Sequence, residues 1–293
     1  MTNSAPFRPV CRRTRKRLTP RIALMSTLKY AFALFMFALC LFPFLWIVIS
    51  SLKGQSEIFT IPPSFWIENP TLKNYYDAMA DGSLGTFTWN SAYVAVLTTL
   101  FTTMVSTLCA YAIGFYRFRG RGLLNKSLLA LQLFPGVVTI IPLFIIFRQL
   151  SLINRPFGLV VGNTAGAIST AVILMLGYFG DIPRNLEEAA RIDGANTAQV
   201  LFKIILPLAM PGIASAAIMT FINVWQEYFM ALSFISDRAN YTLPVGISTF
   251  IGAKATNWGG LLATSVVIAV PALTLFVSFQ QYFVDSLAGS VKG

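Results

Sequence analysis

The sequence predicts an all-α membrane protein with six transmembrane helices. Apolar residues make up 56% of the 293 residues and charged residues only 11%, whereas about 25% are charged in an ordinary soluble domain. Six runs without a charged side chain each reach the ~20 residues that a helix needs to cross the hydrocarbon core. These runs are 30–52, 89–116, 127–147, 156–180, 204–226 and 255–284.

The remaining segments are short, and we expect no independent soluble domain. Residues 1–29 form a basic arm, residues 30–293 the six-span domain, and residues 181–203 a polar loop between the fourth and fifth spans. A further apolar piece, Tyr228 to Ser236, is separated from the fifth run by Glu227 and is too short to cross alone. We expect it to lie at the membrane interface or to be re-entrant.

Lysine and arginine are distributed unequally on the two sides of these spans. Eight precede Tyr30 and eight more fall in the loops and tail on the same side, giving 16, whereas six fall on the other side. By the positive-inside rule both termini are cytoplasmic. The net charge of +11 then reflects topology and anionic inner-leaflet lipid, and it does not indicate a nucleic-acid partner.

The basic N-terminal arm could also be a signal-peptide n-region or a nucleic-acid tail. The apolar run behind it is too long for a signal sequence and lacks a small-x-small cleavage site. We therefore interpret it as a lipid-facing anchor before a retained first span. The three cysteines form no disulfide framework or metal pattern, and we expect no metal site.

A polar hairpin between the fourth and fifth runs carries the pattern E-A-A-x3-G-x9-I-x-L-P, from Glu188 to Pro207. Asn185 is a suitable helix N-cap, and Glu188 three residues later completes the spacing of a capping box. Gly194 permits a positive φ that ends this helix, and Asn196 with Gln199 can cap the next. The segment is therefore predicted to be a helix, a glycine elbow and a second helix. Capping alone could explain Glu188.

This pattern resembles the EAA loop of bacterial ABC importer permeases, and other strings in the same order resemble carbohydrate permeases of the MalG type. These strings are Ser51-Leu52-Lys53 with Thr71-Leu72-Lys73-Asn74-Tyr75, Asn90-Ser91, Ala110-Tyr111-Ala112, Ile141-Pro142-Leu143-Phe144, Trp225-Gln226-Glu227-Tyr228 and Thr242-Leu243-Pro244-Val245-Gly246. The resemblance covers nearly the whole chain. It implies the fold of a type I ABC importer permease in the bacterial cytoplasmic (inner) membrane.

The resemblance also implies a function: the transmembrane permease subunit of an ATP-driven, binding-protein-dependent importer of a sugar or oligosaccharide. Such a chain is not itself an enzyme and binds no cofactor, because ATP and Mg belong to a partner ATPase. The implied partners are a cytoplasmic ATPase dimer, a second permease subunit of related sequence, an extracytoplasmic solute-binding protein and membrane lipid. The residues implied in coupling to the ATPase are Glu188, Ala189, Ala190, Asp193 and Gly194.

Substrate contacts must be polar or aromatic and must face a cavity, because an unsatisfied amide in lipid is costly. The candidates are Asn223, Gln132, Asn163, Trp225 and Tyr228. Hydrogen bonds between helices could equally explain the amides. In the MalG-type family a loop between the last two spans reaches the binding protein, which implies contacts from Ile251, Gly252, Ala253, Lys254, Ala255, Thr256 and Asn257. An ordinary flexible loop is the alternative.

Two other classes of function remain open at this stage. A six-helix secondary transporter or channel would explain the composition but not the E-A-A pattern. An intramembrane enzyme would need an acid–base or nucleophilic constellation, yet the sequence has no histidine and no Asp, Glu, Lys or Arg inside a predicted span. The sequence does not identify the sugar or its charge, and it does not decide between identical and different permease partners.

Overall fold

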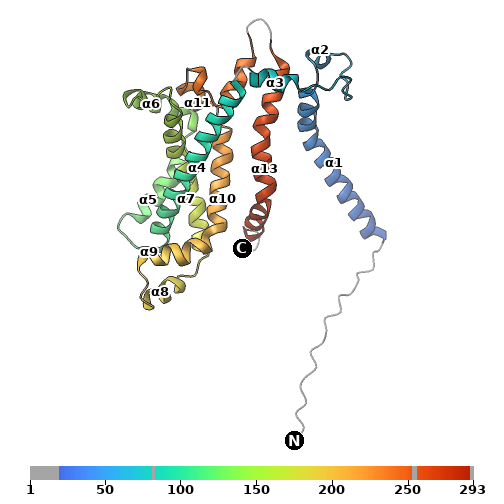
Figure 1. Ribbon diagram of the computed structural model, residues 1–293. Coiled ribbons are helices and arrows are strands. Elements are labelled where there is room, and N and C mark those ends of the chain that lie inside the picture. The colour runs from blue at the N-terminus through green and yellow to red at the C-terminus, as the bar shows by residue number, and fades with distance from the viewer. Residues whose placement is uncertain (1–19, 81–82, 253–255, 291–293) are drawn as a thin grey trace. The chain divides into compact units, whose positions relative to one another are not determined.

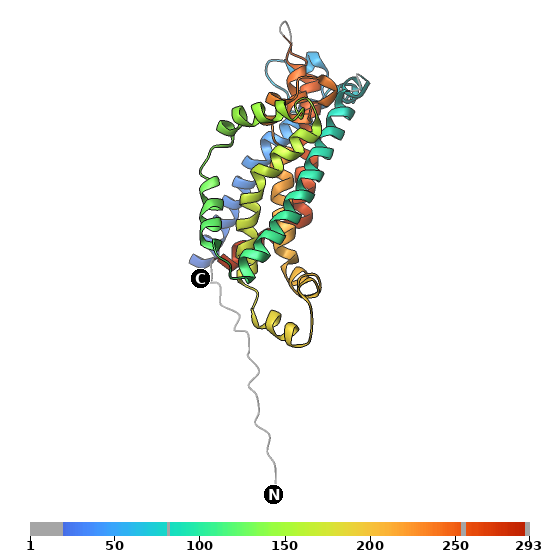
Figure 2. The ribbon, with the colours of Figure 1, turned by 90° about the vertical axis from the view of Figure 1, so that its left-hand side faces the viewer.

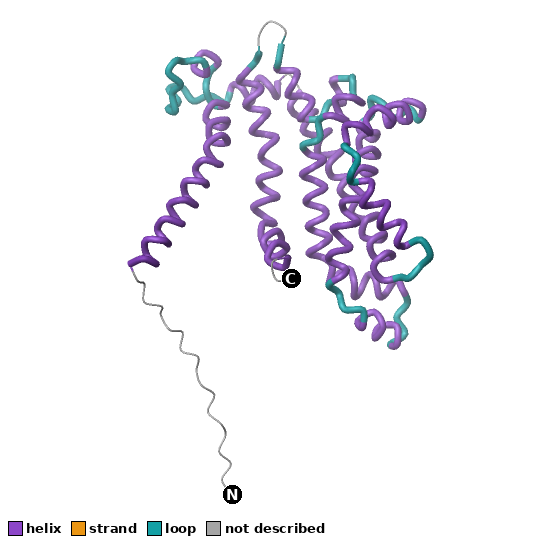
Figure 3. Tube along the Cα trace, turned by 180° about the vertical axis from the view of Figure 1, so that it is seen from behind, coloured by secondary structure: helices purple, strands orange, loops and turns teal. Residues whose placement is uncertain are grey.

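The structure is a computed structural model that describes residues 20–80, 83–252 and 256–290. Throughout these ranges the chain forms helices and loops and no strand, as Figure 3 shows. The chain divides into two compact units, with the boundary between Ile47 and Val48. The predicted all-α class is confirmed.

Five helical stretches of the described chain are long and apolar enough to cross a membrane. Each covers most or all of one of the charge-free runs, because a run of that length can satisfy its backbone in lipid only as a helix. The helices, labelled in Figure 1, are α1 (Pro20–Ser51), α4 (Ser83–Phe115), α7 (Pro156–Gly180), the continuous series α9 (Thr197–Val200), η1 (Leu201–Ile205) and α10 (Leu206–Trp225), and α13 (Trp258–Ser290).

The predicted third span is not one straight helix. It consists of α5 (Arg121–Leu131) and α6 (Gly136–Gln149), which meet at a bend of 103° and make a sixth span only if counted together. Pro135 at the bend has an extended conformation, with φ −60° and ψ 127°. Its ring opposes the carbonyl four residues earlier and keeps Phe134 out of the helical region. The predicted span over 127–147 therefore consists of two helices, with the break at Pro135.

Short helices gather at the two ends of the second unit. One end, called here the α11 end, carries α2 (Gln55–Ile58), α3 (Lys73–Ala80), α11 (Phe229–Phe234), η2 (Arg238–Asn240), α12 (Leu243–Gly246) and η3 (Ile247–Phe250). The other, called the α8 end, carries α8 (Asn185–Ile192). The apolar piece after Glu227 thus forms the six-residue helix α11. Its place at the membrane interface stays a prediction.

The centre of the second unit is formed by α4, α7 and α10, which run side by side (Figure 2). The inward face of α4 carries small hydroxyl residues four positions apart. Thr98, Thr102 and Ser106 are each fully buried. Small residues at this spacing let helix backbones approach closely, which is how helices associate where lipid supplies no hydrophobic drive.

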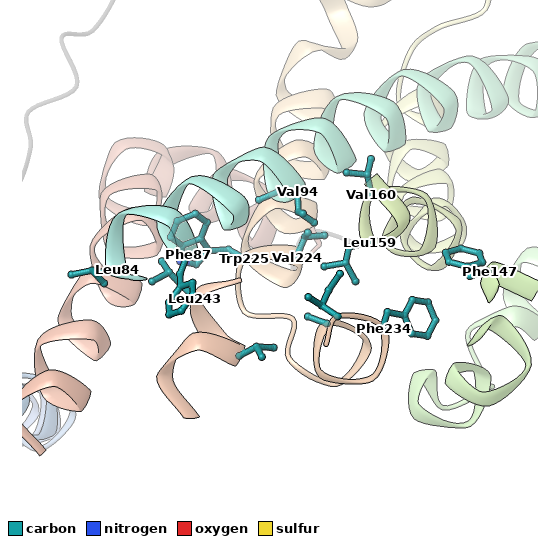
Figure 4. Packing of buried hydrophobic residues seen from close by; sticks show 14 of the residues in the cluster. Leu84, Phe87, Val94, Phe147, Leu159, Val160, Val224, Trp225, Phe234 and Leu243 are labelled. Carbon is teal, nitrogen blue, oxygen red and sulfur yellow. The ribbon is translucent and has the colours of Figure 1, made fainter. Parts of the chain in front are cut away.

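Toward the α11 end, buried side chains join α4, α7, α10, α11 and α12 (Figure 4). Phe87, Trp225 and Leu243 belong to this cluster. Hydrogen bonds from α4 fix the loop that follows α11: Asn90 Nδ2 donates to the carbonyl oxygens of Ala239 at 2.9 Å and Tyr241 at 3.0 Å. The turn between α10 and α11 therefore lies between the buried end of α10 and a loop that is hydrogen-bonded to α4.

Toward the α8 end, a second buried cluster joins α4 and α7 to the polar segment. It includes Tyr111 of α4, Phe179 of α7, Ala190 of α8 and the fully buried Val200 and Ile205. This cluster is the base on which the E-A-A segment rests.

Candidate functional site

The E-A-A segment has the predicted glycine elbow. Gly194 has φ +83°, and its N–H donates to Arg191 O at 3.1 Å while the next N–H, of Ala195, donates to Ala190 O at 2.9 Å. This pair of bonds is a Schellman motif, which satisfies the last carbonyls of α8 and needs a left-handed residue at the glycine position. After the elbow, Asn196 and Gln199 form the predicted capping box. The helix, elbow and second helix are confirmed.

The predicted cap at the start of α8 is wrong. Asn185 lies inside the helix, and the cap position is Arg184, whose side chain makes no cap hydrogen bond. The chain begins to turn earlier, because the N–H of Leu186 donates to Pro183 O and those of Glu187 and Glu188 donate to Arg184 O. The backbone carbonyls of Pro183 and Arg184 thus accept the N–H groups of the first turn, which the Asn185 side chain was expected to accept. The capping-box role of Glu188 falls with it.

An ion pair within α8 that sequence reasoning missed holds Arg191 beside Tyr116, the residue that follows α4. Glu187 Oε1 accepts from Arg191 Nη2 at 2.7 Å and Nε at 3.0 Å, and its side chain is only 12% exposed. Arg191 Nη2 also donates to the hydroxyl of Tyr116 at 2.9 Å. The hydrogen bond with Glu187 raises the pKa of Arg191 above its ordinary value. The signal in the sequence was the i, i+4 spacing of acid and base.

The other face of this segment is open. Glu188, Ala189, Asp193 and Gly194 are exposed, and beside them the apolar Ile192 is 86% exposed. Ala190, the fifth predicted coupling residue, is buried in the cluster below. The segment is therefore a short helix with a fixed base and an exposed surface that is partly acidic and partly apolar.

A cavity of about 410 Å³ opens among α6, α7, α10 and α11. Two predicted pathway residues line it, Asn163 of α7 and Asn223 of α10, together with the half-buried Glu227. Asn163 Nδ2 donates to Leu159 O at 2.9 Å, and Asn223 is exposed. The lining combines amide, hydroxyl and carboxylate groups with apolar side chains, a combination suited to a polyhydroxylated ligand.

The other three predicted pathway residues do not line this cavity. Gln132 is exposed at the bend between α5 and α6. Trp225 is buried, its indole N–H donates to Ile268 O at 2.9 Å, and its ring stacks on Phe221. Tyr228 packs against the buried cluster and edge-on against Phe229. Substrate contact by any of the five stays a prediction.

The loop before α13 is a narrow hairpin. Ile251 and Thr256 form an antiparallel bridge, and the N–H of Asn257 donates to Phe250 O at 2.8 Å. Ile251 and Gly252 are exposed, whereas the predicted contacts Ala253, Lys254 and Ala255 lie outside the described residues. A side chain at Gly259 would meet the Asn74 amide, so glycine is required for this close approach. Within the described part of the chain, no group of metal-ligating side chains occurs.

Comparison with known proteins decides the class. Residues 106–288 match the family described as "Binding-protein-dependent transport system inner membrane component". The chain belongs to this family. The permease is accordingly a multi-pass inner-membrane subunit and not itself an enzyme. This membership rules against the alternatives of a secondary transporter, a channel or an intramembrane enzyme.

Curated relatives match the permease over most of its length. SmoH of Agrobacterium fabrum, a sulfoquinovosyl glycerol transport system permease protein, is 40% identical over 255 residues, which are 86% of the permease and 89% of the relative. MalG of Thermococcus litoralis, a trehalose/maltose transport system permease protein, is 35% identical over 265 residues, covering 89% of the permease and 95% of the relative.

A solved structure shares the fold. It belongs to a bacterial ABC transporter involved in the import of the acidic polysaccharide alginate, and it superposes with a TM-score of 0.80 at 23% sequence identity. The match covers 91% of the permease and 99% of that chain. The type I importer permease fold expected from the sequence is confirmed.

Proposed function

We propose that the permease supplies half of the pathway for a sugar or oligosaccharide in an ATP-driven importer. Both curated relatives described above carry sugar-containing solutes in their names. The cavity supports this substrate class, because Asn163 and Asn223 can each donate to and accept from sugar hydroxyls at a site partly shielded from water. Asn223 is the pathway residue that we rank first.

Coupling to ATP occurs, in this proposal, through the exposed face of α8 and its elbow. A dimer of cytoplasmic ATPase subunits holds ATP and Mg²⁺ and contacts Glu188, Ala189, Asp193 and Gly194, while Ala190 anchors the helix from below. The α8 end is then cytoplasmic, and both termini lie on that side. The hydrogen bond from Arg191 to Tyr116, just after α4, makes α8 move with α4 when the ATPase closes.

Two more partners complete the transporter. A second permease of related but different sequence supplies the other wall of the pathway. A solute-binding protein docks on the α11 end and is contacted by the segment from Ile251 to Asn257, in which Ile251 and Gly252 are exposed and Ile251 is bridged to Thr256. A bulky label on a cysteine at Ile251 should then reduce stimulation of ATP hydrolysis by the liganded binding protein and leave basal hydrolysis unchanged.

The observation that carries the proposal is the E-A-A segment, fixed at its base and exposed on its other face. The test is to purify the complex gently from its own membrane and ask whether a P-loop ATPase accompanies the permease in stoichiometric amount. Uptake of a panel of sugars by the reconstituted complex then identifies the substrate. Absence of an ATPase, or sugar uptake that does not require ATP, would overturn the assignment.

A further inference from the structure

The cavity among α6, α7, α10 and α11 is electrostatically one-sided. Glu227 is the only charged residue among the described residues that line it, and none of those residues is a lysine or arginine. The remaining polar lining consists of the amides Asn163 and Asn223 and three threonine hydroxyls. An anionic solute in this space would meet a carboxylate and no compensating cation.

The carboxylate of Glu227 is fixed in place. One oxygen accepts the N–H of Met230 at 2.6 Å and the other accepts the N–H of Ala231 at 3.0 Å. Both bonds suit the ionised form, which only accepts. Burial raises the pKa of Glu227 above its ordinary value, and the two backbone hydrogen bonds act in the opposite direction.

Glu227 also stands close to the groups that a sugar would contact. Thr220 and Asn223 lie three residues apart on α10, so they share a face of that helix, and Glu227 lies in the turn that follows it. All three line the cavity, as does Asn163 of α7. In a partly shielded space a fixed charge acts over a longer distance than in bulk water. Hydroxyl groups are compatible with a carboxylate neighbour, because they can donate to it.

We infer that this cavity accepts neutral polyhydroxylated solutes and disfavours anionic ones, and that Glu227 sets this preference. The inference rests on the proposed function, since it assigns a charge class to the sugar. The solutes named for two similar proteins are anionic. Sulfoquinovosyl glycerol carries a sulfonate, and alginate is an acidic polysaccharide by its description.

The electrostatic preference can be measured without knowing the sugar. A reporter cysteine replaces Met219, which lines the cavity and is 43% exposed, in a chain whose Cys11, Cys40 and Cys109 are changed to serine. The complete complex in lipid nanodiscs is treated with two methanethiosulfonate reagents of similar size, one cationic and one anionic. Each rate is divided by the rate for a simple thiol in solution, both in the resting complex and with an ATP analogue and binding protein.

We expect the cationic reagent to react faster by on the order of tenfold, from a unit charge about two helical turns from the reporter in a partly shielded space. Glu227→Gln should bring the ratio close to one, and the matched variant Glu227→Asp should preserve it. Acidifying the unmutated complex is a second route to the same loss of preference. Equal rates in the unmutated chain, faster reaction of the anion, or a thiol that neither reagent reaches would overturn the inference.

Transport gives the second arm. Glucosyl glycerol and sulfoquinovosyl glycerol differ in charge at one position of the sugar, and the inference expects uptake of the neutral member to exceed uptake of the anionic one at least tenfold. Preferred uptake of the sulfonate would overturn the charge assignment and leave the sugar importer intact. A complex that lacks an ATPase would overturn the proposed function, while the thiol measurement would still report the cavity charge.

Discussion

Gly194→Ala is the sharpest perturbation of the coupling segment, because the structure separates its strain from any steric effect. The residue has φ +83°, and a Cβ built on it would meet no atom within 4 Å. The cost is therefore the left-handed conformation itself, about 1–2 kcal/mol for an L-residue. Nothing else in the elbow needs to move.

This cost falls on the Schellman motif that ends α8. Local opening should become easier by roughly 5- to 30-fold, which corresponds to 1–2 kcal/mol. The amide of Ala195, which donates to Ala190 O at 2.9 Å, reports the opening directly through its hydrogen-exchange rate. Sugar-stimulated ATP hydrolysis should fall along with it, since α8 would transmit motion less rigidly.

Two matched variants distinguish strain from other causes. Gly194→Asn should lose less than the alanine variant, because asparagine tolerates the left-handed region. Gly122→Ala changes a glycine inside α5 whose Cβ position is also open and whose φ is ordinary, and it should be neutral or stabilising by about 0.5–1 kcal/mol. If the Ala195 amide exchanges at the same rate in all variants, the argument from backbone strain is refuted.

Four further predictions concern single side chains. Asn223→Leu should lower sugar uptake or alter substrate preference; a change confined to thermal stability, on the order of 1 kcal/mol, would indicate a bond between helices instead. Glu188→Lys places a cation in the first turn of α8, which destabilises the helix by about 0.5–1 kcal/mol through the helix dipole. The variant should also bind the ATPase more weakly. Import at the wild-type rate would contradict a coupling role for Glu188. Pro207→Ala should preserve assembly, seen by gel filtration, and lower sugar-stimulated ATP hydrolysis; unchanged hydrolysis would show that the wide turn before it is dispensable. Because burial raises the pKa of Glu227, acidification should abolish the cavity's cation preference at a higher pH than that of an ordinary glutamate, and a ratio constant down to pH ~4 would refute this.

The parts of the fold that the sequence predicts correctly depend on local signals. A charge-free run of sufficient length has only the helix available in lipid, so five spans follow from composition. The elbow follows from Gly194 because a left-handed residue is needed there, and the capping box of Asn196 and Gln199 involves backbone only three residues away. Such signals do not depend on what packs against the segment.

The predictions that were wrong concern positions where the sequence is compatible with more than one local structure, and tertiary contacts determine which one forms. Pro135 breaks the third span, yet Pro142 and Pro211 lie inside helices, so the presence of a proline alone does not predict where the chain bends. Two adjacent glutamates lie in the first turn of α8, and only the packing beside Tyr116 determines that Glu187 is buried and Glu188 exposed. For Trp225 the sequence shows an aromatic platform, whereas its N–H partner, Ile268 O, lies 43 residues away.

The I-x-L-P end of the E-A-A pattern has a physical reason that joins the coupling segment to the cavity. Pro207 has no N–H to donate to the carbonyl of Lys203, and its ring would clash with that carbonyl in a regular α-helix. Just before Pro207 the chain forms a π-helical turn, Leu201–Ile205. In this turn the N–H of Leu206 donates to Leu201 O. In an α-helix, the side chains of residues five positions apart point about 140° away from each other. In a π turn, where the hydrogen bond runs from residue i to residue i+5, they lie on nearly the same side of the helix. Val200 and Ile205 are both fully buried in the cluster with α4 and α7. The wide turn therefore lets the helix after the elbow and the helix that lines the cavity rest on the same surface. We expect a displacement of α8 to be carried through this packing to α10, where Asn223 lines the cavity.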